Sequence, residues 1–231
     1  MGFVRWFKKD GKWNINRITG GAFICAALVF SLVGCFYTPY DPNAINGELK
    51  NTAPSLAHLF GTDNFGRDVF SRVMKGAGTT FLVGLSVVTA GAVGGCLLGA
   101  FTGYFGGKAD LILMRVNDAI AAIPSILLAL VFVGVFGSGT VQLIAALGIL
   151  FIPSFARVVR SGFLVQKELD YVKNARLMGA GHLRIMFVHI LPNLKSSLFS
   201  ALAIGFNNAV LSEAAMSYLS LGVQLPDASL G

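Results

Sequence analysis

Five long apolar stretches constrain this chain more than any other feature of its sequence. A helix that crosses a membrane needs about 20 mostly apolar residues. Hydrophobic residues make up 55% of the chain and charged residues 13%, a balance typical of a protein solvated by lipid. The sequence therefore predicts an all-α, polytopic membrane protein with five transmembrane helices, at residues 18–38, 78–101, 111–135, 140–158 and 194–221.

These stretches divide the chain into four parts. Residues 1–17 form an N-terminal segment, and residues 18–38 form the first transmembrane helix. Residues 39–77 are rich in turn formers and are predicted to be a solvated loop that ends in a short amphipathic helix. Residues 78–231 form a membrane core that contains a charged loop at residues 159–193.

The basic residues predict the orientation, because Lys and Arg in short flanking segments stay in the cytoplasm. With the N-terminus inside, fourteen basic residues lie on the cytoplasmic side and four outside. The outer four are Lys50, Arg67, Arg72 and Lys75, and the inner ones are Arg5, Lys8, Lys9, Lys12, Arg17, Lys108, Arg115, Arg157, Arg160, Lys167, Lys173, Arg176, Arg184 and Lys195. We therefore expect a cytoplasmic N-terminus. Because five spans would leave the C-terminus outside, we also expect a sixth span after Gly231.

The first span has one competing interpretation. Residues 1–38 resemble a secretory signal, and residues 32–35 fit a bacterial lipoprotein cleavage site, which would leave Cys35 lipidated on a soluble protein. However, four further spans follow Cys35, and a stretch of about 21 residues exceeds the roughly 7–15 of a signal-peptide core. A transmembrane helix is the preferred interpretation.

The sequence shows no catalytic, nucleotide-binding or metal-binding constellation. The segment at residues 103–108 ends in Gly-Lys, but Thr102 and Ala109 occupy the positions where a phosphate-binding loop needs Gly and Ser or Thr. The histidines His58, His182 and His189 are far apart and fall in loops. We expect no enzymatic activity, no metal site and no cofactor bound by this chain.

The charged loop at residues 159–193 has helical spacing. Residues 170–180 predict one helix that turns near Gly179, and residues 182–189 predict a second helix that Pro192 ends. Ala175 and Gly179 are four residues apart, so on one helical face they would let a partner's backbone approach closely. An ordinary solvated loop with a glycine cap remains the alternative.

This loop resembles the EAA loop of ABC importer permeases. That pattern is Glu-Ala-Ala, three residues, Gly, and then a short helix ending in Ile-x-Leu-Pro. The chain departs from it at Lys173, Asn174 and His189. The resemblance implies that the loop couples the chain to an ATPase through Ala175, Gly179, Ala180, Leu191 and Pro192.

A second motif narrows the family. Residues 60–72 are similar to the Gly-Thr-Asp-x-x-Gly-Arg-Asp signature of dipeptide, oligopeptide and nickel permeases. This signature belongs to the subunit type that has a long loop after the first span. Residues 103–124 and 213–222 continue the likeness, so that it covers nearly all of residues 60–231. The signature residues in the outer loop are Gly61, Thr62, Asp63, Gly66, Arg67 and Asp68.

The resemblance implies a permease subunit in a bacterial inner membrane. Its partners would be a second, homologous permease, two cytoplasmic ATPases that use ATP and Mg, and an extracytoplasmic substrate-binding protein. The implied cargo is a dipeptide or oligopeptide, with nickel or a metal chelate as the alternative. A secondary transporter would need discontinuous helices and several ionisable groups at the midplane, and a membrane enzyme would need a polar catalytic cluster.

Polar groups and glycines inside the predicted spans have separate interpretations. Gly91, Gly95, Gly99 and Gly103 recur at every fourth position and predict a ridge for close helix packing. Glu213, Asn207 and Asn208 lie well inside the last span, where an unpaired charge is costly. They are candidates for a pathway or gate, and the alternative for Glu213 is a buried hydrogen bond between helices.

Overall fold

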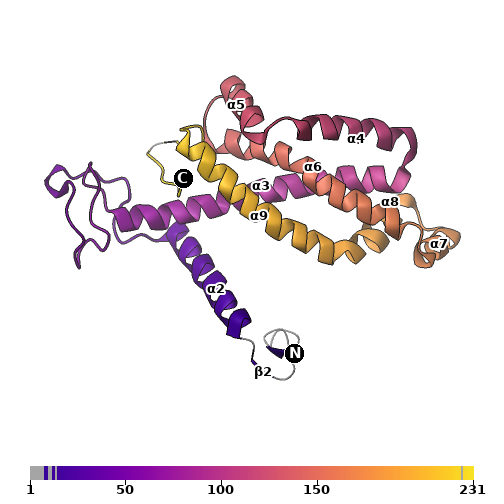
Figure 1. Cartoon of the computed structure of the whole chain (residues 1–231), viewed down its shortest axis with the longest axis horizontal. Helices are drawn as coiled ribbons and strands as arrows, with labels where there is room; N and C mark the ends of the chain where they lie inside the picture. Colours follow the sequence, from indigo (N-terminus) through magenta and orange to yellow (C-terminus); the bar gives the residue numbers. More distant parts are fainter. Residues whose placement is uncertain (1–7, 10–11, 14, 225) are drawn as a thin grey trace. The chain divides into compact units, whose positions relative to one another are not determined.

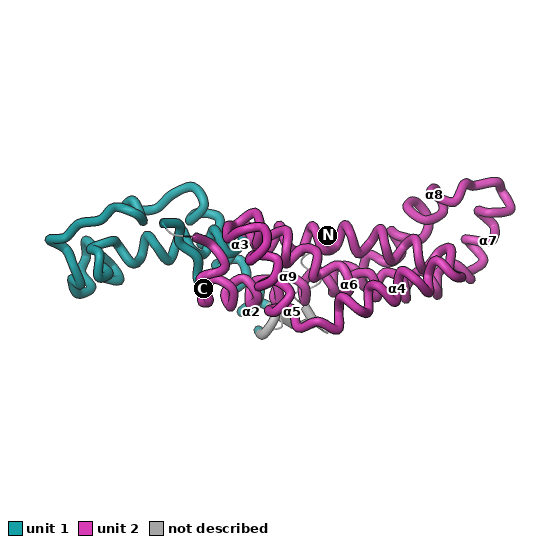
Figure 2. The backbone as a smooth tube through the Cα atoms, turned by 90° about the horizontal axis from the view of Figure 1, so that it is seen from above, with its two compact units in different colours: residues 1–81, 226–230 teal, residues 82–225, 231 magenta. Residues whose placement is uncertain are grey.

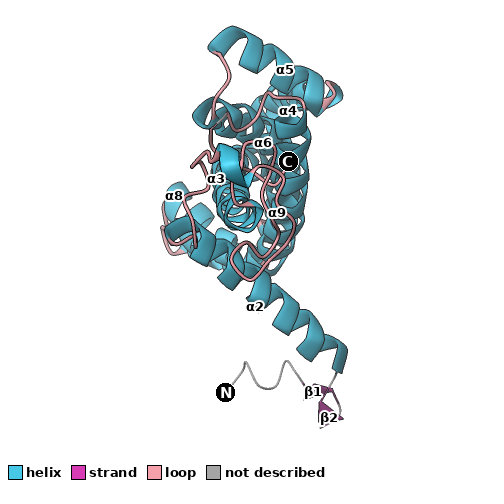
Figure 3. Cartoon of the chain, turned by 90° about the vertical axis from the view of Figure 1, so that its left-hand side faces the viewer, coloured by secondary structure: helices cyan, strands magenta, loops and turns pink. Residues whose placement is uncertain are grey.

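The computed structural model describes residues 8–9, 12–13, 15–224 and 226–231, and its regular secondary structure is almost entirely helical (Figures 1 and 3). Several residues of the predicted N-terminal segment, including Arg5, lie outside the described residues. The chain divides into two compact units, residues 1–81 with 226–230 and residues 82–225 with 231 (Figure 2). The elements are β1 (Lys8–Lys9), β2 (Lys12–Trp13), α2 (Ile15–Phe36), η1 (Gly47–Leu49), α3 (Val69–Phe105), α4 (Gly107–Ala122), α5 (Ser125–Phe136), α6 (Thr140–Gln166), α7 (Asp170–Leu177), α8 (His182–Arg184), the π-helix η2 (Ile185–Ile190), the 3₁₀-helix η3 (Leu191–Leu194) and α9 (Lys195–Tyr218).

Four helices are long and apolar enough to cross a membrane, and α4 with α5 makes a fifth if that bent pair counts as one span. The prediction of an all-α, polytopic protein is therefore confirmed, apart from the two-residue strands β1 and β2, which pair antiparallel near the N-terminus. Helix α3 has 37 residues, or about 56 Å, which exceeds the roughly 30 Å of a bilayer core.

The third predicted span, at residues 111–135, is not one helix. Helices α4 and α5 meet at an angle of 91°. Pro124 causes the break, because proline disfavours a helical conformation in the residue before it. Ile123 accordingly has an extended backbone, with φ −83° and ψ 130°.

The second span begins earlier than predicted. No separate amphipathic helix ends the outer loop within residues 39–77, because α3 starts at Val69 and continues without a break into the membrane segment. Within the first unit, a Cβ on Gly34 of α2 would collide with the backbone of Met74 of α3. The missing side chain at Gly34 therefore lets these two helices pack backbone to backbone.

In the second unit the predicted glycine ridge packs α3 against α6. A Cβ on Gly91 would lie 2.6 Å from the Cβ of Phe151, and one on Gly103 would lie 2.6 Å from the Cβ of Phe163. At Gly99 the added Cβ would lie 2.5 Å from the carbonyl oxygen of Ala156. Only hydrogen fits at these positions, so the packing interpretation is confirmed.

Helix α6 continues beyond the predicted end at Val158 because its basic residues have partners on α4. Arg160 donates two hydrogen bonds to Asp110, at 2.6 and 2.7 Å, in the parallel arrangement that guanidinium and carboxylate groups favour. Arg157 donates to Asp118 at 3.2 Å. Figure 1 shows α4 running alongside α6.

Pro192 does not end the second helix of the charged loop, which corrects the prediction. The helical path runs without a break from His182 to Tyr218. Proline removes one backbone donor and crowds the preceding turn. The chain accommodates it with a wide π turn, in which the Leu191 N–H bonds to the Met186 carbonyl five residues back.

Candidate coupling helices and membrane cavity

Helix α7 ends in a tight reversal at Gly179. The Ala180 N–H bonds to the Ala175 carbonyl and the Gly179 N–H bonds to the Arg176 carbonyl, both at 3.0 Å. This pair of hydrogen bonds is the Schellman motif, which requires a left-handed backbone conformation at the position that Gly179 occupies. The φ of Gly179 is +81°, a conformation that glycine adopts without steric cost.

A buried cluster fixes α7 and η2 to the ends of α3 and α6. Val172 of α7 and Ile185 of η2 are fully buried there beside Phe163 of α6 and Tyr104 of α3. A displacement of α7 would therefore pull on both membrane helices. The buried members are Ala100, Tyr104, Val159, Phe163, Val172, Ile185, Met186, Ile190 and Leu194.

Hydrogen bonds reinforce this attachment. The hydroxyl of Tyr104 lies 2.9 Å from Nδ1 of His182, and the guanidinium of Arg176 lies 5.7 Å from the centre of the Tyr104 ring. Lys167 donates to the Gly103 carbonyl at 3.0 Å. One aromatic side chain at the end of α3 thus contacts both α7 and α8.

The structure separates the five predicted coupling residues into two groups. Ala175, Ala180 and Leu191 are partly buried against the cluster, so they face the chain's own interior. Gly179 and Pro192 are exposed. Ala175 and Gly179 therefore do not form one continuous outer face. The apolar side chains exposed around the glycine turn, which we call the exposed tip, are Leu177, Met178 and Leu183, with 86%, 87% and 69% of their surface accessible.

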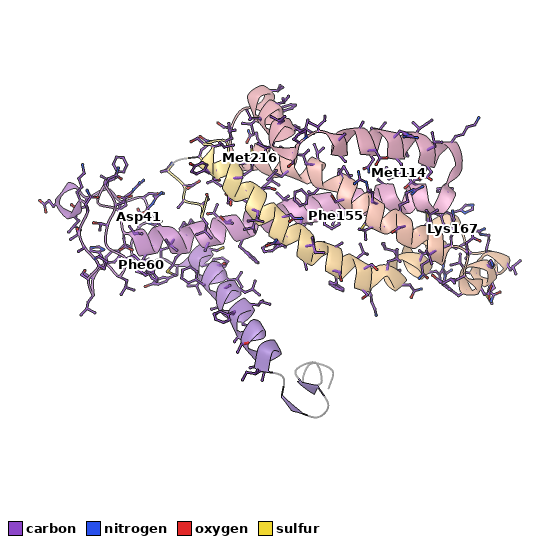
Figure 4. The ribbon with its side chains drawn as sticks, in the orientation of Figure 1. Asp41, Phe60, Met114, Phe155, Lys167 and Met216 are labelled. Carbon is purple, nitrogen blue, oxygen red and sulfur yellow. The ribbon has the colours of Figure 1, made fainter. Side chains whose placement is uncertain are left out.

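A cavity of about 530 Å³ lies between α6 and α9 in the second unit. Phe155 of α6, which Figure 4 labels, lies against α9 at Gly205, where an added Cβ would be 2.8 Å from its ring. The start of α5 contributes Ser125. The lining residues are Ser125, Leu150, Phe151, Ser154, Phe155, Val158, Ala201, Ile204, Gly205, Asn208, Leu211 and Ser212.

Of the three predicted pathway residues, Asn208 lines this cavity and the other two do not. Asn207 is exposed on α9. Glu213 is fully buried in α9 and accepts a hydrogen bond from the Ser217 hydroxyl at 2.7 Å. Glu213 is therefore buried and hydrogen-bonded, as the second interpretation expects. This hydrogen bond, however, joins two residues of α9, whereas that interpretation expects a bond between helices.

Glycines in the outer signature let the loop close on itself. Gly61 and Gly66 have φ of +70° and +74°. A Cβ at either position would collide with a backbone carbonyl, that of Thr52 or of Asn46. Thr62 between them is buried, and its hydroxyl accepts from the Thr52 N–H at 2.9 Å and contacts the Leu49 carbonyl.

The acidic signature residues hold the turn and the start of α3. Asp63 accepts from the side chain of Arg67 at 2.7 Å and from the backbone of Phe65 at 2.8 Å. Burial alone would raise the pKa of Asp63, but these bonds outweigh it and the pKa lies below its usual value. The signature is therefore the scaffold of the loop.

Asp68 caps helix α3. Its carboxylate accepts from the Ser71 N–H at 2.7 Å and lies 2.9 Å from Nδ1 of His58. Burial opposes ionisation here too, and the bonds from Ser71 and His58 prevail, so the pKa of Asp68 is lowered. An acceptor at this position satisfies a backbone donor that the first helical turn leaves free.

Sequence reasoning missed Tyr104, His182 and Ser154 as site residues. Tyr104 and His182 are 78 residues apart and have no local pattern that would pair them. Ser154 follows Pro153 inside an apolar stretch, where a serine gives no signal of its own. Within the described residues, no group of three or more His, Cys, Asp or Glu side chains is placed to hold a metal ion.

Comparison with known proteins identifies the family. Residues 95–231 match the model of the binding-protein-dependent transport system inner membrane component. The chain is 38% identical over 210 residues to the glutathione transport system permease protein GsiD of Pectobacterium atrosepticum, covering 90% of this chain and 70% of that protein.

Two further relatives have similar coverage. A putative peptide transport system permease protein of Brucella suis is 40% identical over 212 residues, which cover 92% of this chain and 71% of that protein. The di/tripeptide transport system permease protein DppC of Pseudomonas aeruginosa is 36% identical over 219 residues, covering 92% of this chain and 72% of that protein. This multi-pass membrane chain therefore belongs to the family of binding-protein-dependent transport system inner membrane components, as its resemblance to ABC importer permeases predicts.

Proposed function

We propose that this chain is a permease subunit of an ATP-driven importer and that it carries peptides across the bacterial inner membrane. The observation that carries this proposal is the attachment of an exposed helix, α7, to the ends of two long membrane helices. Val172 and Tyr104 supply that attachment through the buried cluster. The chain provides the transport pathway, and α7 acts as a lever that passes movement to the membrane helices. ATP hydrolysis belongs to the partners of the chain.

The exposed tip of the lever has the chemistry of a protein contact. Leu177 and Met178 expose most of their surface just before the glycine turn, and the buried core of a protein–protein contact is more apolar than the surface around it. An ATPase subunit in the cytoplasm is the occupant that we propose. Its movement on binding ATP would be passed through α7 to α3 and α6.

The proposed cargo is a small peptide, because similar proteins are named for glutathione, for peptides and for di- and tripeptides. Nickel import is not favoured by these names. Import of this type needs a binding protein outside and ATPases inside, and we propose one further permease and two ATPase subunits. We propose a cytoplasmic N-terminus on the basis of the fourteen-to-four division of basic residues.

Purification with partners tests this function. We expect the tagged chain, extracted gently from its own membranes, to carry ATPase subunits and a second permease with it. The purified assembly should hydrolyse ATP faster when peptide-loaded binding protein is added. Recovery of the chain without ATPase subunits, under conditions that preserve known importers, would contradict the proposal.

A further inference from the structure

The wall of the cavity between α6 and α9 is mostly apolar, with four uncharged polar side chains in it. Ser154 and Asn208 face the same space as Ser125 and Ser212. Phe151 and six other apolar side chains make up most of the remaining wall. Among the described residues that line the cavity, none carries a formal charge.

This combination suits the part of a peptide that all peptides share. Hydroxyl and carboxamide groups both donate and accept hydrogen bonds, so they can satisfy the N–H and C=O groups of a main chain that has left water. The aromatic rings of Phe151 and Phe155 offer apolar surface to side chains of different sizes. A fixed charge on the wall would instead favour one charge class of peptide and repel another.

We propose that this cavity is a peptide-contact site in the pathway, in which Ser154, Asn208 and Ser212 hold the peptide main chain. The uncharged wall makes passage independent of the charge on the peptide's side chains. The inference rests on the proposed function and names which residues of the chain meet the cargo. Selection by charge then belongs to the binding protein.

A charge placed at Asn208 tests this assignment. The complete importer is reconstituted, and uptake is measured for two tripeptides, one with a central lysine and one with a central glutamate. Each variant's lysine-to-glutamate uptake ratio is divided by that of the unmodified importer, which cancels any preference of the binding protein. Asn208→Asp should raise the ratio at least about threefold, and Asn208→Lys should lower it by a similar factor, as expected for charges about 6 Å apart in a watery site.

The neighbouring residue provides a matched control. Asn207 has the same side chain, lies on the same helix and is exposed, but it does not line the cavity. Asn207→Asp should therefore leave the uptake ratio unchanged. Equal shifts from Asn207→Asp and Asn208→Asp, or active uptake with no shift from the Asn208 variants, would overturn the assignment.

A second measurement covers variants that lose uptake. In an importer whose Cys25, Cys35 and Cys96 are replaced, Asn208→Cys should react with a small hydrophilic thiol reagent, and saturating tripeptide with its binding protein should slow that reaction. Asn207→Cys should show no such protection. Reaction of Asn208→Cys at the same rate with and without peptide would overturn the inference. Complete lack of reaction would also overturn it, because another helix would then fill the cavity.

The two proposals fail in different ways. If the unmodified importer takes up neither tripeptide, the proposed function is wrong and the cavity assignment falls with it. If the unmodified importer is active and Asn208→Cys is not protected, the importer function stands and only the cavity assignment is wrong.

Discussion

Gly179 and Gly181 form a natural pair for testing the lever at the scale of one residue. A Cβ at either position would meet no atom of the described residues within 4 Å, so neither is limited by space. They differ in backbone, because φ is +81° at Gly179 and −67° at Gly181. A side chain in the left-handed region costs about 1–2 kcal/mol.

We predict that Gly179→Arg sharply reduces ATP-driven uptake while the chain still inserts in the membrane. The substitution strains the turn after α7 and puts bulk at the exposed tip. Gly181→Arg, which adds the same bulk without the strain, should have a much smaller effect. Uptake at the unmodified rate by a Gly179→Arg importer that assembles normally would show that the turn plays no part in coupling.

Asp68 gives a prediction about pH. Its pKa is lowered from the usual 3.8, so its ionised form stabilises the folded chain at pH values above 3.8, and that contribution is lost as the pH falls through the lowered value. Asp68→Asn keeps a cap acceptor but removes the charge. The Tm of the unmodified chain should exceed that of Asp68→Asn at pH 5, and the difference should shrink below pH 3.8. A difference that does not change with pH would contradict the role of the carboxylate.

At the scale of elements, the contact between α3 and α6 depends on bare glycine backbone. Gly99→Ala would place a Cβ against the Ala156 carbonyl, and overpacking of this kind typically costs about 1–3 kcal/mol. Gly134 on α5 has no such neighbour within 4 Å among the described residues, so Gly134→Ala should be neutral or stabilising. The Tm in detergent should fall for the first variant and not for the second. Equal Tm values would mean that the two helices separate easily.

The existence of each membrane element could be predicted from the sequence, but not its path. Apolar length alone predicts α2, α3, α6 and α9. The bend before α5 has a visible cause in Pro124, yet a proline inside an apolar stretch predicts a kink as readily as a break. The prediction at Pro192 was wrong in the opposite sense: we expected the proline to end the helix, but the wide turn of η2 accommodates it and the helix continues.

The site was predictable in part, for a related reason. Gly179 follows from local rules, since a glycine after a charged helix commonly forms its cap. The orientation of Ala175 depends on Tyr104 and Phe163, which lie far away in the sequence. The cavity at Asn208 likewise depends on how α6 and α9 pack, and helical spacing within α9 alone carries no information about that packing.

At the scale of the whole molecule, exposed positions at the two predicted faces test the orientation. Leu56 in the outer loop is fully exposed, and Met178 beside the glycine turn is 87% exposed. In cells whose copy of the chain lacks its native cysteines, Leu56→Cys should react with a thiol reagent that cannot cross the membrane. Met178→Cys should react only after the membrane is permeabilised. The reverse pattern would place the N-terminus outside.

The most direct test of the account is peptide uptake by the complete importer in sealed vesicles. With ATP on the cytoplasmic face and peptide-loaded binding protein on the other, we predict accumulation of peptide that stops when ATP is replaced by a non-hydrolysable analogue. An imposed proton or sodium gradient should not replace ATP. Uptake driven by an ion gradient in vesicles that contain this chain without ATPase subunits would contradict the account and indicate a secondary transporter.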